Sequence, residues 1–142
     1  DMNIGQVLED TLLYFDYVCP MVYPSHYASG FLGYKNPANY PYEVIKYSLD
    51  TAQIRINKFK EEKLAENPYQ NLRIAVLRPW LQNFDLGAVY DASMIIKQKE
   101  AVYDSLCPNW KIEGFDNCSN YNGWFLWDPK NIYTPSALED EF

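Results

Sequence analysis

Three short apolar runs divide the chain, and each ends in a group of aromatic and hydrogen-bonding residues. The runs are Tyr17–Tyr23, Leu72–Leu77 and Gly123–Trp127. Their length and their apolar and aromatic content predict β-strands. A helical pattern precedes the first run and separates each run from the next, so the predicted order is α-β-α-β-α-β. Helical crossovers join parallel strands, so the residues that follow all three strands are expected on one edge of the sheet.

The predicted helices carry apolar stripes at helical spacing. The segment Pro41–Lys63 has apolar residues in steps of four and three, and Asp91–Leu106 has a second stripe after Asp91, a suitable N-cap residue. A shorter pattern over Asn3–Phe15 predicts an opening helix, which Gly5 weakens by about 1 kcal/mol relative to Ala. The stripe of the longest segment consists of Ile45, Leu49, Ala52, Ile56 and Phe59.

This order of elements predicts one α/β domain with parallel strands. In such folds ligands bind at the carboxyl ends of the strands, and in (β/α)8 barrels that face carries the active site. The connections Pro24–Asn39 and Arg78–Tyr90 are longer than usual for loops between a strand and a helix, so both are expected to carry function. Pro20 is at odds with a strand interior, because it cannot donate a ladder hydrogen bond and suits an edge or a bulge.

Composition narrows the possible partners. The 142 residues are 48% hydrophobic and 17% aromatic, enough for a core with aromatic side chains left to line surfaces. A net charge of −7 without a Lys/Arg cluster predicts no nucleic-acid partner. No apolar run approaches the ~18 residues that a membrane-spanning helix needs. With His26 as the sole histidine and no phosphate-binding glycine loop, we expect no metal and no cofactor, and a different small α/β enzyme is disfavoured.

The cysteines and the first residue leave questions open. Cys19 lies in a predicted strand and is interpreted as a small buried hydrophobic residue. Cys107 and Cys118 are eleven residues apart, which allows a disulfide without requiring one. The chain begins with Asp1 instead of an initiator Met, so we expect an upstream segment that carried targeting information. The compartment is therefore unknown, with an extracytoplasmic location as one option.

Four strings of residues resemble one known family. They are, in chain order, Tyr23–Tyr27 (YPSHY), Pro41–Val44 (PYEV), Arg78–Gln82 (RPWLQ) and Gly123–Asp128 (GWFLWD). They resemble the C-terminal half of the putative glycosyl hydrolase domain family, over about residues 4–133. The resemblance implies a TIM barrel and a carbohydrate substrate. Because a complete barrel takes ~250 residues, it also implies that residues 1–142 are the C-terminal part of the domain, with about three to four βα units, and that the earlier strands are missing.

The residues at the strand ends are interpreted as a sugar site. Trp80 and Trp127 offer indole faces for stacking on a pyranose and N–H groups for its hydroxyls, with a place in the core as the alternative. Arg78 and Gln82 are hydrogen-bonding residues for sugar hydroxyls or a carboxylate, or else structural caps and partners. His26 offers a donor and an acceptor in a polar loop. The predicted substrate-binding set is Tyr23, His26, Tyr27, Arg78, Trp80, Gln82 and Trp127.

Glycoside hydrolysis uses two carboxyl groups, about 5 Å apart in retaining enzymes and farther apart in inverting ones. Asp128 directly follows a strand and is the predicted catalytic residue, although a role as a turn or cap residue before Pro129 is the simpler explanation. Asp85 and Asp91 lie in the preceding loop and helix start, where Asp91 is better explained as a cap. The sequence therefore shows no convincing pair of carboxylates within residues 1–142, and in a hydrolase the second one is expected on the missing strands.

Two functions stay open at this point. The chain is either part of an O-glycosyl hydrolase acting on a poly- or oligosaccharide, inactive without its missing strands, or a non-catalytic carbohydrate-binding or protein-interaction module on the same barrel. Strands cut from a closed barrel have unpaired edges, each a template for another chain. We therefore expect self-association, or pairing with the missing half of the barrel.

Overall fold

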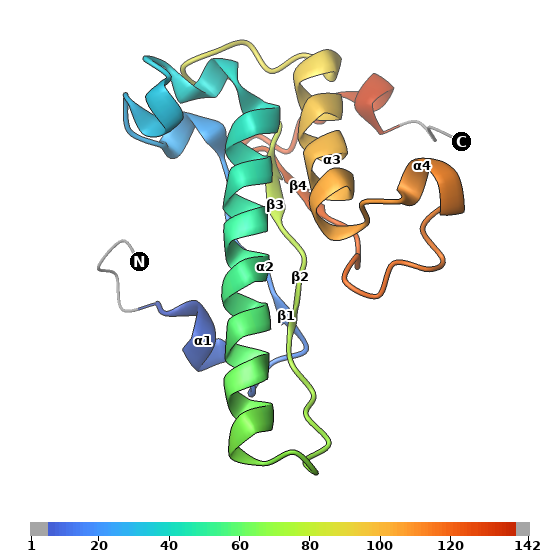
Figure 1. Ribbon diagram of the computed structural model, residues 1–142. Coiled ribbons are helices and arrows are strands. Elements are labelled where there is room, and N and C mark those ends of the chain that lie inside the picture. Colours follow the sequence, from blue (N-terminus) through green and yellow to red (C-terminus); the bar gives the residue numbers. More distant parts are fainter. Residues whose placement is uncertain (1–5, 139–142) are drawn as a thin grey trace.

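Four short β-elements form parallel pairs in the middle of the molecule (Figure 1). The structure is a computed structural model that describes residues 6–138. β1 (Tyr17–Val18) pairs with β2 (Val76–Leu77), and β3 (Trp80–Gln82) pairs with β4 (Phe125–Trp127), both in parallel. The predicted parallel direction of the strands is confirmed, and the chain is a mixed α/β structure.

Two prolines explain why the ladder is assigned in short pieces. The N–H groups of Arg78 and Trp80 donate to the carbonyl oxygens of Val18 and Pro20, both at 2.9 Å. Pro20 and Pro79 have no N–H to donate, so each removes one possible ladder bond without turning the chain away. The first strand therefore continues past Val18, and β2 and β3 are successive parts of one middle strand.

Two strands begin later than the sequence predicts. The middle strand starts at Val76, after irregular backbone from Leu72 onward. The last strand starts at Phe125 instead of Gly123. Gly123 has a φ of +80°, which is a left-handed conformation that strands do not use and that glycine adopts readily.

The middle strand also ends later than predicted. Pro79 suggests a loop from Arg78 onward, but a parallel bridge joins Met21 to Trp80, and the strand runs to Gln82. Arg78 and Trp80 therefore lie inside the strand. Of this predicted loop segment, Gln82 alone stands at the carboxyl end.

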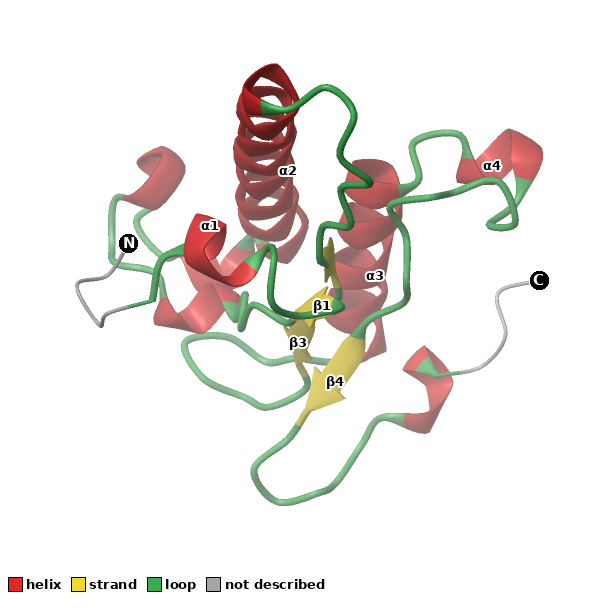
Figure 2. Ribbon diagram, turned by 90° about the horizontal axis from the view of Figure 1, so that it is seen from below, coloured by secondary structure: helices red, strands yellow, loops and turns green. Residues whose placement is uncertain are grey.

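Two long helices cover one face of the strands (Figures 1 and 2). α2 (Pro41–Glu66) connects the first strand to the middle strand, and α3 (Ala92–Leu106) connects the middle strand to the last. Figure 2 shows both helices on the same side of the strands. The Asp91 side chain accepts a hydrogen bond from the Met94 N–H at 3.0 Å, which confirms the predicted N-cap.

The core lies between this helix pair and the strands. Leu77 and Leu81 of the middle strand are almost fully buried in it. Because side chains alternate along a strand, Arg78 and Trp80 lie on the opposite face, away from α2 and α3. The buried core residues are Leu12, Val22, Ile45, Leu49, Ile56, Ala75, Leu77, Leu81, Ala101, Val102 and Leu106.

Shorter helices complete the described part of the chain. α1 (Leu8–Thr11) is shorter than the predicted opening helix, whose start at Asn3 lies outside the described residues. α4 (Trp110–Glu113) follows α3 and was not predicted. No helix within residues 6–138 is long and apolar enough to cross a membrane. Single 3-10 turns span Pro24–His26, Phe31–Gly33, Pro37–Asn39 and Pro135–Ala137.

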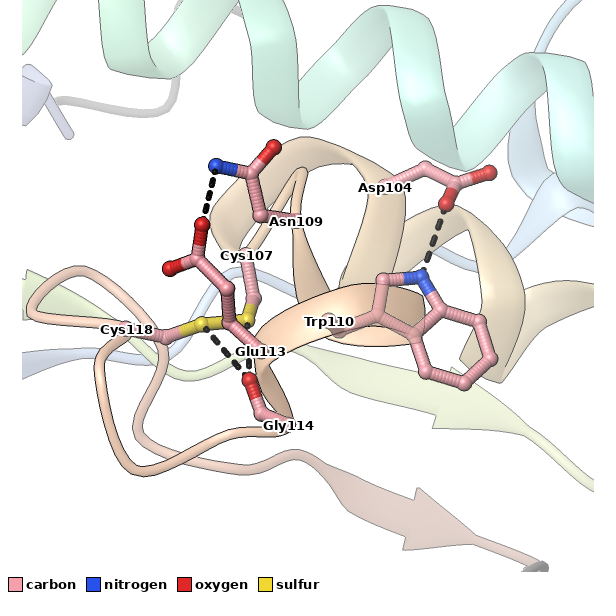
Figure 3. Close-up of a disulfide and its surroundings, with 7 residues drawn as sticks. All are labelled: Asp104, Cys107, Asn109, Trp110, Glu113, Gly114 and Cys118. Carbon is pink, nitrogen blue, oxygen red and sulfur yellow. Dashed lines mark hydrogen bonds between the residues drawn. A yellow bond between two sulfur atoms is a disulfide. The ribbon is translucent and has the colours of Figure 1, made fainter.

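A disulfide between Cys107 and Cys118 closes the segment that contains α4 (Figure 3), which answers the question left open by the sequence. The two Cα atoms are 5.1 Å apart, and both sulfurs lie within 3.7 Å of the Gly114 carbonyl oxygen. On the other side of α4, the Trp110 indole N–H donates to Asp104 of α3 at 2.9 Å. The disulfide and this hydrogen bond fix the short helix against the end of α3.

Candidate functional site

The carboxyl ends of the strands lie on one edge of the sheet, because the strands are parallel. Three segments follow these ends and form what we call the rim: Tyr23–Tyr27, Gln82–Tyr90 and Asp128–Thr134. The rim contains most of the residues that the sequence predicts to form the site, together with several that it does not predict. Their arrangement decides what chemistry the edge supports.

Gln82 connects two rim segments from a fully buried position. Its Oε1 accepts hydrogen bonds from the Ser25 hydroxyl at 2.9 Å and the Ser25 N–H at 3.3 Å. Its Nε2 donates to the Phe84 carbonyl oxygen at 2.8 Å. Gln98 of α3 holds both main-chain groups of Gln82, at 2.8 and 2.7 Å. With its hydrogen-bonding groups engaged in this way, Gln82 positions the rim.

An aromatic cluster stands beside this network. The ring of Tyr23 lies 5.4 Å from that of His26 and 5.6 Å from that of Phe84, both in edge-to-face geometry. His26 is exposed, and its Nδ1 lies 3.1 Å from the Ser25 hydroxyl oxygen. Tyr23 is buried, and the loss of solvent raises the pKa of its phenol. The cluster therefore presents His26 to solvent on a packed aromatic support.

Tyr27 points in another direction. Its hydroxyl is 2.8 Å from the Ser48 hydroxyl on α2, and its ring lies 4.5 Å from that of Phe31. Burial raises the pKa of the Tyr27 phenol, and the bond to Ser48 opposes this shift. The structure thus brings Tyr23, His26 and Gln82 together but places Tyr27 against the helix.

A cavity of about 360 Å³ opens between the last two rim segments. Its size falls in the range of small-ligand sites. It has aromatic, amide and charged groups in its wall. The lining residues that matter here are Asn83, Phe84, Asp85, Asp128, Lys130 and Tyr133.

Asp128 is buried in the wall of this cavity, with 6% of its surface exposed. Its Oδ1 accepts hydrogen bonds from the Lys130 N–H at 2.6 Å and the Ile132 N–H at 3.3 Å, so it holds the turn after β4. Its Oδ2 has no hydrogen-bond partner among the described residues. One oxygen of Asp128 therefore holds the turn, while the other has no partner among the described residues.

Asp85 is a second carboxylate in the wall of the same cavity, and it was not among the site residues predicted from the sequence. Its Oδ1 accepts a hydrogen bond from the Tyr90 N–H at 2.7 Å, which closes the loop after β3. The sequence predicts the strand to end at Leu77, so it gives no local signal for Asp85, which lies three residues after the observed strand end at Gln82. Asn83 was missed as well: it donates from Nδ2 to the Ile132 carbonyl oxygen at 2.9 Å and so ties the two rim segments together.

Arg78, Trp80 and Trp127 form a separate group on the strand face away from α2 and α3. The Trp80 ring stacks on Phe125 at 4.4 Å and meets Trp127 edge-on at 6.2 Å. The Arg78 guanidinium lies 4.2 Å from the Phe125 ring centre, and its buried Nε has no hydrogen-bond partner among residues 6–138. Trp127 is 42% exposed and is the member of this group nearest the rim in sequence.

We find no cluster of side chains suited to bind a metal ion in the part of the chain that the structure describes. No group of three or more His, Cys, Asp or Glu side chains converges there. The polar groups of the rim are carboxylates, amides, hydroxyls, one imidazole and the ammonium of Lys130. These groups bind and transfer protons.

In α/β folds ligands bind at the carboxyl ends of the parallel strands, which is where this cavity lies. Residues 1–133 match the putative glycosyl hydrolase domain, and the chain therefore belongs to this family. No curated protein and no solved structure matches the chain.

Proposed function

We propose that the chain is part of an O-glycosyl hydrolase acting on a poly- or oligosaccharide, with its site at the rim. The observation that carries this proposal is the cavity that contains both Asp85 and Asp128. Glycoside hydrolysis needs one carboxyl group to protonate the leaving oxygen and another to attack the anomeric carbon or to activate water. Membership of the putative glycosyl hydrolase domain family supports the same reaction class.

The two aspartates have the anchoring that such a role requires. Each uses Oδ1 to accept main-chain N–H bonds, Asp128 from Lys130 and Ile132 and Asp85 from Tyr90. These bonds fix the orientation of the carboxyl groups and leave Oδ2 for a ligand. A carboxylate held in one orientation reacts with less reorganisation.

We also propose that residues 1–142 belong to a (β/α)8-like barrel, as its later part. Consecutive strands lie side by side in chain order, and α2 and α3 cover the same face. Doubly wound sheets place helices on both faces, whereas barrels place them all outside. On this proposal the face with Arg78, Trp80 and Trp127 points into the barrel, and further strands complete the wall.

The aromatic residues supply the binding surface in this proposal. Trp127 precedes Asp128 in the chain and Tyr133 lines the cavity. Both are partly exposed, and an aromatic ring stacks on the C–H face of a pyranose. His26 contributes hydrogen bonding from the neighbouring segment. Arg78 and Trp80 support the ring of Phe125 and contact substrate in a closed barrel. Tyr23 and Gln82 position the rim. Tyr27 fixes the outer loop of the rim.

The test is hydrolysis by the longest available form of the protein, measured as reducing ends released from cello-, malto- and chito-oligosaccharides. Asp85→Asn and Asp128→Asn should each lower turnover by at least about a hundredfold. Asp91→Asn is the matched control, because it makes the same change at an N-cap, where Asn serves as well as Asp. Turnover that survives both cavity variants would contradict the assignment. Binding without turnover would favour a non-catalytic carbohydrate-binding module.

A further inference from the structure

A chain of hydrogen bonds crosses the rim from α3 to the exposed ring of His26. Gln98 bonds both main-chain groups of Gln82, at 2.8 and 2.7 Å. The Ser25 hydroxyl bonds Gln82 Oε1 at 2.9 Å, and its oxygen lies 3.1 Å from His26 Nδ1. Gln82 and Gln98 are fully buried, so water does not compete for this part of the chain.

Two main-chain groups fix which way the Gln82 amide points. The Phe84 carbonyl oxygen can only accept, so the amide atom 2.8 Å from it must be the donor Nε2. The Ser25 N–H can only donate, so the amide atom 3.3 Å from it must be Oε1. The reversed amide would set oxygen against oxygen and N–H against N–H. The Ser25 hydroxyl, facing Oε1, therefore donates its proton to Gln82.

The bond between Ser25 and His26 can then run in one direction only. A hydroxyl has a single proton, and Gln82 already receives it, so Ser25 Oγ accepts from His26. Nδ1 must carry the proton. In a neutral imidazole the other nitrogen, Nε2, is then bare and acts as an acceptor. Nε2 has no hydrogen-bond partner among the described residues, and the ring is exposed.

We propose that Ser25 and Gln82 are positioning residues that hold neutral His26 in the Nδ1–H tautomer, so that Nε2 accepts a hydrogen bond from a hydroxyl group of a bound carbohydrate. Phe84 lines the cavity and lies 6.1 Å, ring to ring, from His26, so His26 packs against a residue of the cavity wall. The identity of the ligand as a carbohydrate rests on the proposed function. The assignment of the Nδ1–H tautomer rests on hydrogen-bond geometry alone.

Nuclear magnetic resonance of the ring nitrogens tests the tautomer without any ligand. His26 is the only histidine, so the ¹⁵N-labelled chain gives one set of imidazole signals. At about pH 9, above the range in which an ordinary imidazole titrates, Nδ1 should appear as the proton-bearing nitrogen and Nε2 as the bare one. A proton found mainly on Nε2 would overturn the proposal.

Variants of Ser25 sharpen this test. Ser25→Ala removes the acceptor for Nδ1–H and should abolish the tautomer preference, whereas Ser25→Thr keeps a hydroxyl and should retain it. Ser29→Ala is the control, because Ser29 lies in the same loop but bonds the Lys35 carbonyl oxygen at 2.7 Å. An unchanged tautomer in Ser25→Ala would overturn the role of Ser25.

Titration with cello-, malto- and chito-oligosaccharides separates this inference from the proposed function. A sugar that binds should shift the Nε2 signal more than the Nδ1 signal, and Ser25→Ala should weaken its binding by about tenfold, the equivalent of one hydrogen bond of ~1.4 kcal/mol. Binding that leaves Nε2 unchanged would overturn the acceptor role. If none of these sugars binds while the tautomer is as expected, the carbohydrate assignment fails and the positioning of His26 stands.

Discussion

Asp128 holds a turn and also has a free oxygen, and substitution can separate the two roles. Asp128→Asn keeps an oxygen for the N–H groups of Lys130 and Ile132, so unfolding free energy should stay within about 0.5 kcal/mol of wild type. Asp128→Ala loses both bonds and should cost about 1–2 kcal/mol. Urea unfolding followed by circular dichroism measures the difference. Equal losses in the two variants would contradict the turn role.

The sequence indicates some candidate site residues well and others poorly. Asp128 stands out because it directly follows an apolar run, and His26 because it lies three residues after one. Asp85 could not be chosen over Asp91, because the loop that closes on Tyr90 has no periodicity to place it. Gln82 was taken as a ligand contact, but only the fold shows that Ser25 and Phe84 engage its amide.

At the scale of elements, an ion pair joins α1 to α2 and predicts a pH dependence. Arg55 Nε donates to Glu9 at 2.8 Å, and this hydrogen bond lowers the pKa of Glu9 below its usual value. The pair therefore adds stability above the unfolded-state pKa of Glu9, and this gain is lost as pH falls through the folded-state pKa. Because Arg55 is 41% exposed, water screens the gain to about 0.5 kcal/mol.

Glu9→Gln should accordingly lower the melting temperature slightly at about pH 7 and leave it unchanged once the pH falls below the lowered folded-state pKa, where the carboxylate is protonated in both states. Glu62→Gln is the control, because its pairing with Lys58 is longer, at 3.8 Å, and more exposed. A deficit of Glu9→Gln that persists at low pH would show that packing, and not charge, joins the two helices.

The elements themselves were predictable to different degrees. The apolar stripe of α2 and the Asp91 cap located the long helices, since both are local signals. The predicted end of the middle strand was wrong at Pro79. Proline removes one hydrogen-bond donor, but the ladder continues at Trp80. α4 was missed because its single turn is held by the disulfide and by Asp104, which are tertiary contacts.

At the scale of the whole molecule, the Cys107–Cys118 bond ties the end of α3 to the segment before β4. Closing a loop of eleven residues should stabilise the fold by about 3 kcal/mol through the entropy of the unfolded chain. Reductant, or the double change Cys107→Ser with Cys118→Ser, should lower the unfolding free energy by this amount. Cys19→Ser is the control, since Cys19 is unpaired. An unchanged urea midpoint in reductant would contradict the prediction.

The last prediction concerns association through the strand face that lies away from α2 and α3. It exposes Met21 (71%) and Trp127 (42%), and the first and last strands each pair on one side only within residues 6–138. Such edges and apolar faces are templates for another chain. We therefore expect the 142-residue chain to associate as its concentration rises, either with itself or, in a mixture, with the strands that complete a barrel.

Light scattering over a range of concentrations measures this association. Met21→Lys places a charge on the exposed face, and burying that charge in an interface should weaken association by at least about tenfold, or ~1.4 kcal/mol. Ile54→Lys is the matched control, because Ile54 is 68% exposed on α2 and lies away from the strands. If Ile54→Lys weakens association as much as Met21→Lys, the helices form the interface. A wild-type chain that stays monomeric at every concentration and unfolds cooperatively would show that these three strands are stable without a partner, and the proposal of a barrel completed by further strands would lose its main support.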